Sequence, residues 1–250
     1  MADAAHLLSL PWLLAAVTVV VFLAAIVQIN LGMGFGLMAA PLLALLDPAL
    51  VPVPTLALGL ATASWGAWRE RANVQWREVA LGVPGRILGV AAGAGLLAIM
   101  PGPQYFMLIF GVMIALAVLL SVAGWCLRFT TASMIGMSTL SGLMGTLTSV
   151  GAPPMALIYQ NRPVHLARPT MAAFFAVGCV FSLTGLTLSG WAGPGDLLLV
   201  AIMAPAMLAG TFVARRLGRR FDRRFRPALL AISALAAGIL ILRGIGGLTG

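Results

Sequence analysis

Residues 142–154, Gly-Leu-Met-Gly-Thr-Leu-Thr-Ser-Val-Gly-Ala-Pro-Pro, interrupt an apolar stretch that covers residues 129–159. A similar interruption, Leu-Gly-Met-Gly-Phe-Gly-Leu-Met-Ala-Ala-Pro at residues 31–41, lies within apolar residues 11–46. Each stretch is longer than the roughly 20 residues that one membrane-spanning helix needs. Because glycine and proline interrupt helices, we expect each stretch to form a helical hairpin or broken helix that turns inside a membrane.

The composition of the whole chain supports a membrane environment. Of the 250 residues, 61% are hydrophobic and only 8% are charged, whereas soluble domains carry roughly 25% charged residues. The N-terminus has no basic residue before its apolar run, so we expect that run to be retained rather than cleaved as a signal peptide. The net charge of +9 comes from arginines clustered between apolar runs, which indicates membrane topology rather than nucleic-acid binding.

Six other apolar runs are suited to single membrane spans. They cover approximately residues 53–68, 79–99, 104–124, 169–189, 196–214 and 227–245. Arginines are concentrated in the segments 69–78, 125–132, 160–168 and 215–226. Because basic residues favour cytoplasmic loops, we expect all four segments on the inner side and both chain ends outside.

The two halves of the chain share an ordered set of glycine and proline positions. The matching pairs are Gly32/Gly145, Pro41/Pro154, Pro54/Pro169, Pro84/Pro205 and Gly89/Gly210. They predict a duplication, with a first repeat at residues 1–128 and a second at 129–250. Each repeat would hold one broken helix and three spans, and this odd number of crossings inverts the second copy. The expected fold is an all-α polytopic membrane protein with inverted-topology repeats and about eight membrane segments, or ten if hairpin arms are counted separately.

Broken helices at matching positions of two repeats indicate a transporter's binding site. A helix that restarts after a break presents its positive dipole end and free N–H groups, both suited to an anion. The candidate substrate-binding residues of the two tips are Gln28, Asn30, Gly32, Gly34 and Gly36, and Thr148, Ser149, Gly151 and Pro154. In the alternative interpretation, the glycines only allow close helix packing.

Arg86 is the main ionisable residue predicted within a span. A cation inside a membrane is costly and indicates function, so Arg86 is a further candidate for substrate binding. Alternatively, its long side chain reaches the cytoplasmic surface. The acidic residues all fall in predicted loops or at span edges, so no proton or sodium relay is expected.

The sequence offers little for catalysis, and we expect no enzyme activity, no cofactor and no metal site. The two cysteines, Cys126 and Cys179, lie far apart and indicate neither a disulfide framework nor a metal site. Ser141-Gly142 is loosely similar to an intramembrane serine protease motif, but Thr139 stands where that motif needs glycine. An intramembrane enzyme is therefore the less favoured alternative.

The chain resembles the sulfite exporter TauE/SafE family of bacterial membrane permeases. The resemblance is carried by Gly32-Met33-Gly34-Phe35-Gly36 leading to Pro41, by Ser141 to Pro154, by Arg168-Pro169-Thr170 and by Pro84-Gly85 with Gly89. It differs from the family pattern at Thr148 and Ser149, where another glycine would be unsurprising, and at Arg86, where a small residue is frequent.

The resemblance implies export of sulfite, sulfoacetate or a related organosulfonate across the bacterial inner membrane. The expected mechanism is alternating access around the two tips at the midplane. The expected partners are a small anionic substrate, the lipid bilayer and a second copy of the chain in a homodimer, but no nucleic acid. A permease for another small anion or metabolite is the alternative within transport.

Overall fold

The computed structural model describes residues 4–31, 35–217 and 225–249. In these residues the only regular elements are helices. The helices are α1 (Ala4–Ser9), α2 (Pro11–Leu31), α3 (Phe35–Leu46), α4 (Val53–Arg69), α5 (Trp76–Ala98), α6 (Pro103–Val122), α7 (Thr131–Thr148), α8 (Ala152–Tyr159), α9 (Val164–Leu188), α10 (Pro194–Leu217) and α11 (Phe225–Thr249). Short 3₁₀ turns η1 (Pro48–Leu50) and η2 (Arg71–Asn73) precede α4 and α5. The predicted all-α fold is confirmed.

Seven of the described helices are long and apolar enough to cross a membrane, and α3 is a shorter apolar helix. The six single spans expected from the sequence each coincide with one of these helices. The seventh, α2, was expected to be one arm of a broken helix, but it has the length of a full span. Helix α3 begins at Phe35, so the interruption predicted within residues 11–46 separates a helix of full-span length from a shorter apolar helix.

Proline and hydroxyl residues set several helix boundaries. Prolines occupy the first turn of α6, α8 and α10, where a missing N–H costs no hydrogen bond. Before α7, the Thr130 hydroxyl accepts the Ser133 N–H and the Ser133 hydroxyl accepts the Thr130 N–H. This reciprocal capping box satisfies two donors at the start of the helix.

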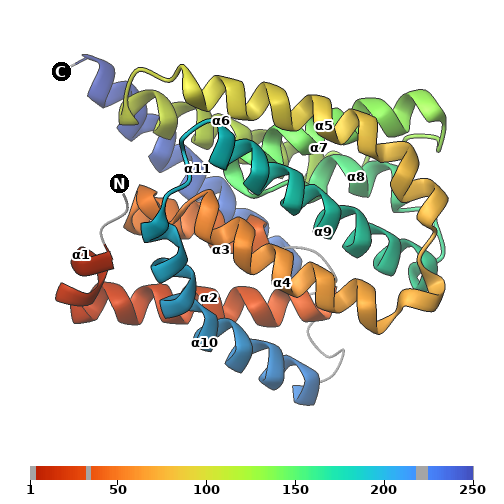
Figure 1. Ribbon diagram of the computed structural model, residues 1–250, viewed down its shortest axis with the longest axis horizontal. Coiled ribbons are helices and arrows are strands. Elements are labelled where there is room, and N and C mark those ends of the chain that lie inside the picture. The colour runs from red at the N-terminus through yellow and green to blue at the C-terminus, as the bar shows by residue number, and fades with distance from the viewer. Residues whose placement is uncertain (1–3, 32–34, 218–224, 250) are drawn as a thin grey trace.

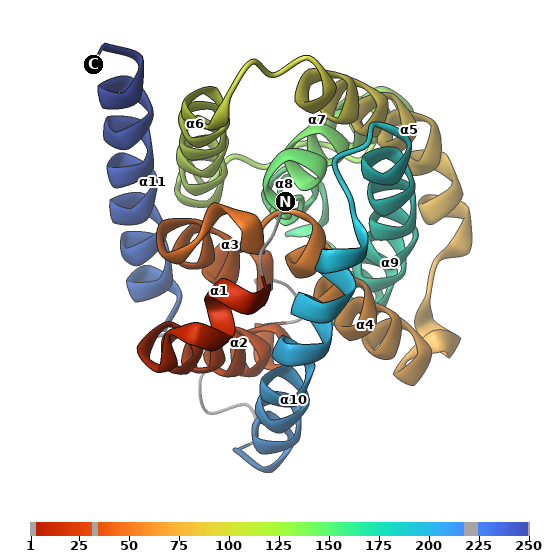
Figure 2. The ribbon, with the colours of Figure 1, turned by 60° about the vertical axis from the view of Figure 1, so that its left-hand side comes forward.

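Pairs of helices from the two halves pack in a matching pattern. The packing of α5 on α7 corresponds to that of α10 on α2, and the packing of α5 on α9 corresponds to that of α10 on α4. Likewise, α3 on α11 corresponds to α8 on α6. Two corresponding helices also pack on each other in the pairs α4–α9 and α6–α11 (Figures 1 and 2). Gly59 faces Cys179 and Gly66 faces Ala172, so the corresponding helices α4 and α9 are antiparallel. This is the packing that an inverted duplication predicts, although the division between residues 128 and 129 stays a prediction.

Three of the four arginine-rich segments lie together at one end of the helix bundle, whereas residues 218–224 of the fourth lie outside the described residues. The three are the α4–α5, α6–α7 and α8–α9 connections, and η1 and the α5–α6 and α9–α10 connections lie at the opposite end (Figure 1). Those opposite connections contain no arginine. This distribution agrees with the expected topology, in which the arginine-rich end faces the cytoplasm.

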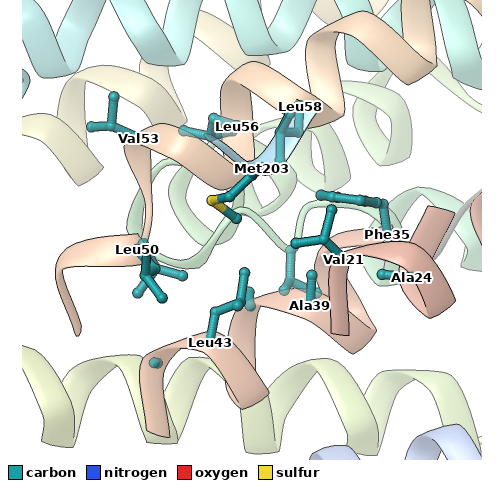
Figure 3. Close-up of a cluster of buried hydrophobic side chains, with 14 of the residues drawn as sticks. Val21, Ala24, Phe35, Ala39, Leu43, Leu50, Val53, Leu56, Leu58 and Met203 are labelled. Carbon is teal, nitrogen blue, oxygen red and sulfur yellow. The ribbon is translucent and has the colours of Figure 1, made fainter. Parts of the chain in front are cut away.

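A buried apolar cluster holds α2, α3, α4 and α10 together (Figure 3). Val21 of α2, Ala39 of α3, Leu56 of α4 and Met203 of α10 are all at most 3% exposed. In a bilayer such a cluster is stabilised chiefly by close packing, since lipid is as apolar as the protein interior. It supports the broken end of α2 and the start of α4, which both border the candidate site.

Candidate functional site

The second tip is a tight turn between α7 and α8. Helix α7 ends at Thr148, and the next residue, Ser149, has a φ of 62° in the left-handed region, where glycine is usual. The Ser149 hydroxyl donates to the Pro52 carbonyl at 2.9 Å. The second tip is thus attached to the residue that precedes α4, in the other half of the chain.

The first tip is bridged by a glutamine side chain. The Phe35 N–H at the start of α3 donates to Gln28 Oε1 at 2.9 Å. Arg168, near the start of α9, donates to the Ile29 carbonyl near the end of α2 at 2.5 Å. Because this carbonyl lies in the last turn of α2, where carbonyls lack helical partners, Arg168 both caps the helix and joins the first tip to the second half.

The two tips touch each other at Gly36. A Cβ atom at this position would lie 2.1 Å from the Ser149 carbonyl oxygen, a separation that no side chain can adopt. Gly36 therefore allows the start of α3 to approach the backbone of the second tip. Close packing and site formation, which the sequence left as alternatives, coincide at this residue.

Arg86 lies in the middle of α5 and its side chain is only 2% exposed. It does not extend to the surface. Its Nη1 donates to the carbonyl of Ser141 at 2.8 Å and to the hydroxyl of Ser141 at 2.9 Å, and Nη2 donates to the Ser182 hydroxyl at 3.3 Å. The Ser141 hydroxyl in turn donates to the Gly151 carbonyl at 2.6 Å. Arg86 therefore connects α5 to α7, α9 and the second tip.

Three glycines make room for the guanidinium group. A Cβ atom at Gly178 would lie 2.5 Å from Nε, at Gly145 2.9 Å from Nη2, and at Gly151 3.0 Å from Nη1. These glycines come from α9, α7 and the second tip. Any larger residue at one of them would displace the charged group or the helix that carries it.

Arg86 has unused hydrogen-bonding capacity and no counter-charge. Its Nε is buried without a hydrogen-bond partner. No described carboxylate forms a salt bridge with it, and its hydrogen-bond acceptors are uncharged oxygens of Ser141 and Ser182. A buried cation with a free N–H donor is suited to an anion, since a guanidinium binds oxyanions through paired N–H groups.

Arg86 borders a small cavity of about 60 Å³ that is partly open to solvent. The lining residues come from both tips and from α4, α5 and α9; they are Gln28, Phe35, Gly36, Leu37, Leu56, Gly59, Ala63, Arg86, Gly145, Ser149, Val150, Gly151, Ala152, Phe175 and Cys179. Arg86 is the only arginine in this described lining, which contains no acidic residue. The cavity therefore combines one cationic group with a largely apolar wall.

The sequence model of the family described as Sulfite exporter TauE/SafE matches residues 17–240. The chain belongs to the TauE/SafE family. The match covers α2 to most of α11 and includes both tips and Arg86. No curated protein and no solved structure matches the chain.

TauE/SafE membership establishes a permease that carries an anion rather than an enzyme. The Ser141 hydroxyl is bonded to the Gly151 carbonyl and to Arg86. Among the described residues, no group of three or more histidines, cysteines or acids is placed to hold a metal.

In this TauE/SafE chain, the cavity brings together five of the ten predicted site residues: Gln28, Gly36, Arg86, Ser149 and Gly151. Thr148 is buried beside it, where its hydroxyl donates to the Met144 carbonyl, and Pro154 is buried within α8. Gly32 and Gly34 lie outside the described residues, as does the side chain of Asn30. Substrate binding by all ten stays a prediction.

Sequence reasoning missed several residues around Arg86. Ser141 was predicted to begin the second tip and was compared with an enzyme nucleophile, but it was not predicted to bind Arg86. Ser182, Gly178 and Cys179 were not predicted as site residues. The spacing of these small and hydroxyl residues along α7 and α9 is a weak signal. Only the packing of α5 against both helices shows that they surround one side chain.

Proposed function

We propose that this protein exports a small sulfur-containing anion, namely sulfite, sulfoacetate or a related organosulfonate. The observation that carries the proposal is Arg86, a buried cation without a carboxylate partner in the wall of a cavity between the two tips. Membership of a sulfite exporter family supplies the sulfur chemistry. A negative cell interior favours anion export by roughly 2.3 kcal/mol per charge per 100 mV, so no coupling ion is required.

The proposed mechanism is alternating access around the two tips. Its support is that each tip is bound to the other half of the chain, through Ser149 to Pro52 and through Arg168 to Ile29. Both contacts are single hydrogen bonds, which a conformational change can exchange at small cost. The bacterial inner membrane as location and the homodimer as assembly belong to the same proposal.

The test is flux of labelled sulfite and sulfoacetate into liposomes that contain the purified protein. We expect saturable flux, and a loss of at least about tenfold in Arg86→Met, because a charge-assisted hydrogen bond contributes about 1.5–3 kcal/mol. Arg243→Met is the matched control, since Arg243 is exposed and donates to the Leu45 carbonyl outside the cavity.

Two results would contradict the proposal. No saturable flux of any sulfonated anion would exclude the substrate class. Equal flux in wild type and Arg86→Met, with both proteins folded, would remove Arg86 from the transport site. Saturable flux of a different small anion alone would favour the other permease function.

A further inference from the structure

The described lining of the cavity has one cationic side chain and few other polar groups that could bind a second charged group. Besides Arg86, its described polar side chains are Gln28, Ser149 and Cys179. The Ser149 hydroxyl already donates to Pro52. Gln28 Oε1 accepts the Phe35 N–H, which leaves its neutral amide NH₂ as the remaining side-chain donor group.

The helix starts that border the cavity are also poor in free N–H groups. Pro153 and Pro154 lie in the first turn of α8 and have no N–H to offer. At the start of α3, the Phe35 N–H is bonded to Gln28. The dipole ends predicted from the sequence are therefore present but have lost several of the donors through which a helix terminus binds anions.

We propose that the cavity selects sulfonates with a single anionic group and an uncharged organic part. This inference rests on the proposed function and narrows its substrate class. Arg86, the one cation of the described lining, binds the sulfonate through its guanidinium group. The organic part lies against the apolar wall formed by Phe35, Leu56 and Phe175, and the Gln28 amide faces a neutral polar substituent.

A second anionic group would find no second cation among the described residues that line this cavity. It would be removed from water and placed against aromatic and aliphatic side chains, where an unpaired charge is strongly disfavoured. A hydroxyl group would lose far less, because one amide donor can satisfy it. We therefore expect similar kcat/KM for 2-hydroxyethanesulfonate and ethanesulfonate, and lower kcat/KM for sulfoacetate and ethane-1,2-disulfonate.

The test is liposome flux of wild-type protein with sulfite and three permanently ionised sulfonates: ethanesulfonate, 2-hydroxyethanesulfonate and ethane-1,2-disulfonate. We expect kcat/KM for the first two sulfonates to agree within about threefold and the disulfonate to be at least 30-fold lower, which corresponds to about 2 kcal/mol. This comparison requires no variant, so misfolding cannot obscure it.

The outcomes separate the two proposals. If neither sulfite nor any sulfonate moves, the proposed function fails. If sulfite moves and the disulfonate moves within threefold of ethanesulfonate, only the charge selectivity fails. If sulfite moves but no alkanesulfonate does, the cavity accepts no organic part and the inference is equally overturned.

Cys179 gives a second readout because its buried thiol lines the same cavity. In a Cys126→Ser background, which removes the exposed cysteine, the reagent 2-sulfonatoethyl methanethiosulfonate should modify Cys179. Ethanesulfonate should slow the modification at least fivefold, and ethane-1,2-disulfonate less than twofold. Equal protection by both would contradict the inference, and Cys126→Ser/Cys179→Ser measures the background.

Discussion

The two halves of this protein have corresponding helices but different side chains at the centre of the third span. Aligning Gly89 of α5 on Gly210 of α10 places Met207 on Arg86. Both glycines lie against a neighbouring helix, because a Cβ atom would be 2.0 Å from the Thr139 carbonyl at one and 2.3 Å from a backbone oxygen at the other. The backbone packing is shared, whereas the charge is present in one half only.

The surroundings of the two positions differ in the same way. Gly89 packs on Gly142, and Gly210 packs on Ala25. These contacts align α7 with α2 in a register four residues away from the one that the Gly32/Gly145 pair predicted, while the shared Pro-Thr dipeptide aligns α9 with α4. In this alignment, the residues of the second half that surround the guanidinium correspond to alanines in the first half. The pairs are Ser141/Ala24, Ser182/Ala67 and Gly178/Ala63. A symmetric backbone therefore supports an asymmetric site, since the hydroxyls that stabilise the cation occur once.

Introducing a cation at the corresponding position of the other half should have the largest effect on stability. In Met207→Arg, the new guanidinium would enter a buried position whose aligned neighbours are alanines, and an uncompensated buried charge costs about 3–5 kcal/mol. We expect little folded protein by size-exclusion chromatography and a large fall in Tm in detergent. Met207→Leu should keep the wild-type Tm, and a folded Met207→Arg with unchanged Tm would refute the asymmetry.

The shared glycine packing gives the next largest effect. Gly89→Ala and Gly210→Ala should each cost about 1–3 kcal/mol, because a methyl group would be forced into backbone. Gly95→Ala is the matched control on α5, since a Cβ there meets nothing within 4 Å. Thermal unfolding in detergent should show lower Tm for the first two variants alone. A loss at Gly89 without a loss at Gly210 would mean that the halves do not pack alike.

Substitution of the two serines that bind Arg86 should have the smallest effects, and it tests which serine positions the guanidinium. Ser141→Ala removes the 2.9 Å bond from Arg86 and the 2.6 Å bond to Gly151, whereas Ser182→Ala removes only a 3.3 Å bond from Arg86. Because bonds to charged groups contribute about 1.5–3 kcal/mol, we expect roughly tenfold lower sulfonate flux for Ser141→Ala. Ser182→Ala should lower flux by no more than about threefold, and the reverse order would show that Ser182 holds the guanidinium.

Much of this fold could be predicted from the sequence because spans are local features. Apolar run length and arginine position predicted the helices and the end of the bundle that carries the arginines. The length of α2 could not be predicted, because glycines near residue 32 indicate an interruption without telling how much helix precedes it. The contacts of Arg86 could not be predicted, since they depend on the register between helices far apart in the chain. That register is set by glycine contacts such as Gly89 on Gly142, which have no signature in either helix alone.

The hydrogen bonds of Arg86 also have a consequence for how the chain is made. Ser141 and Ser182 lie 55 and 96 residues after it, so at 5–20 residues per second the ribosome adds them roughly 3–20 s later. During that interval α5 carries a cation without its serine partners, which lowers what the helix gains from entering the lipid core alone. We therefore expect α5 to settle in the lipid core more readily after α7, and then α9, have been made, since these helices carry the hydroxyls that bind Arg86.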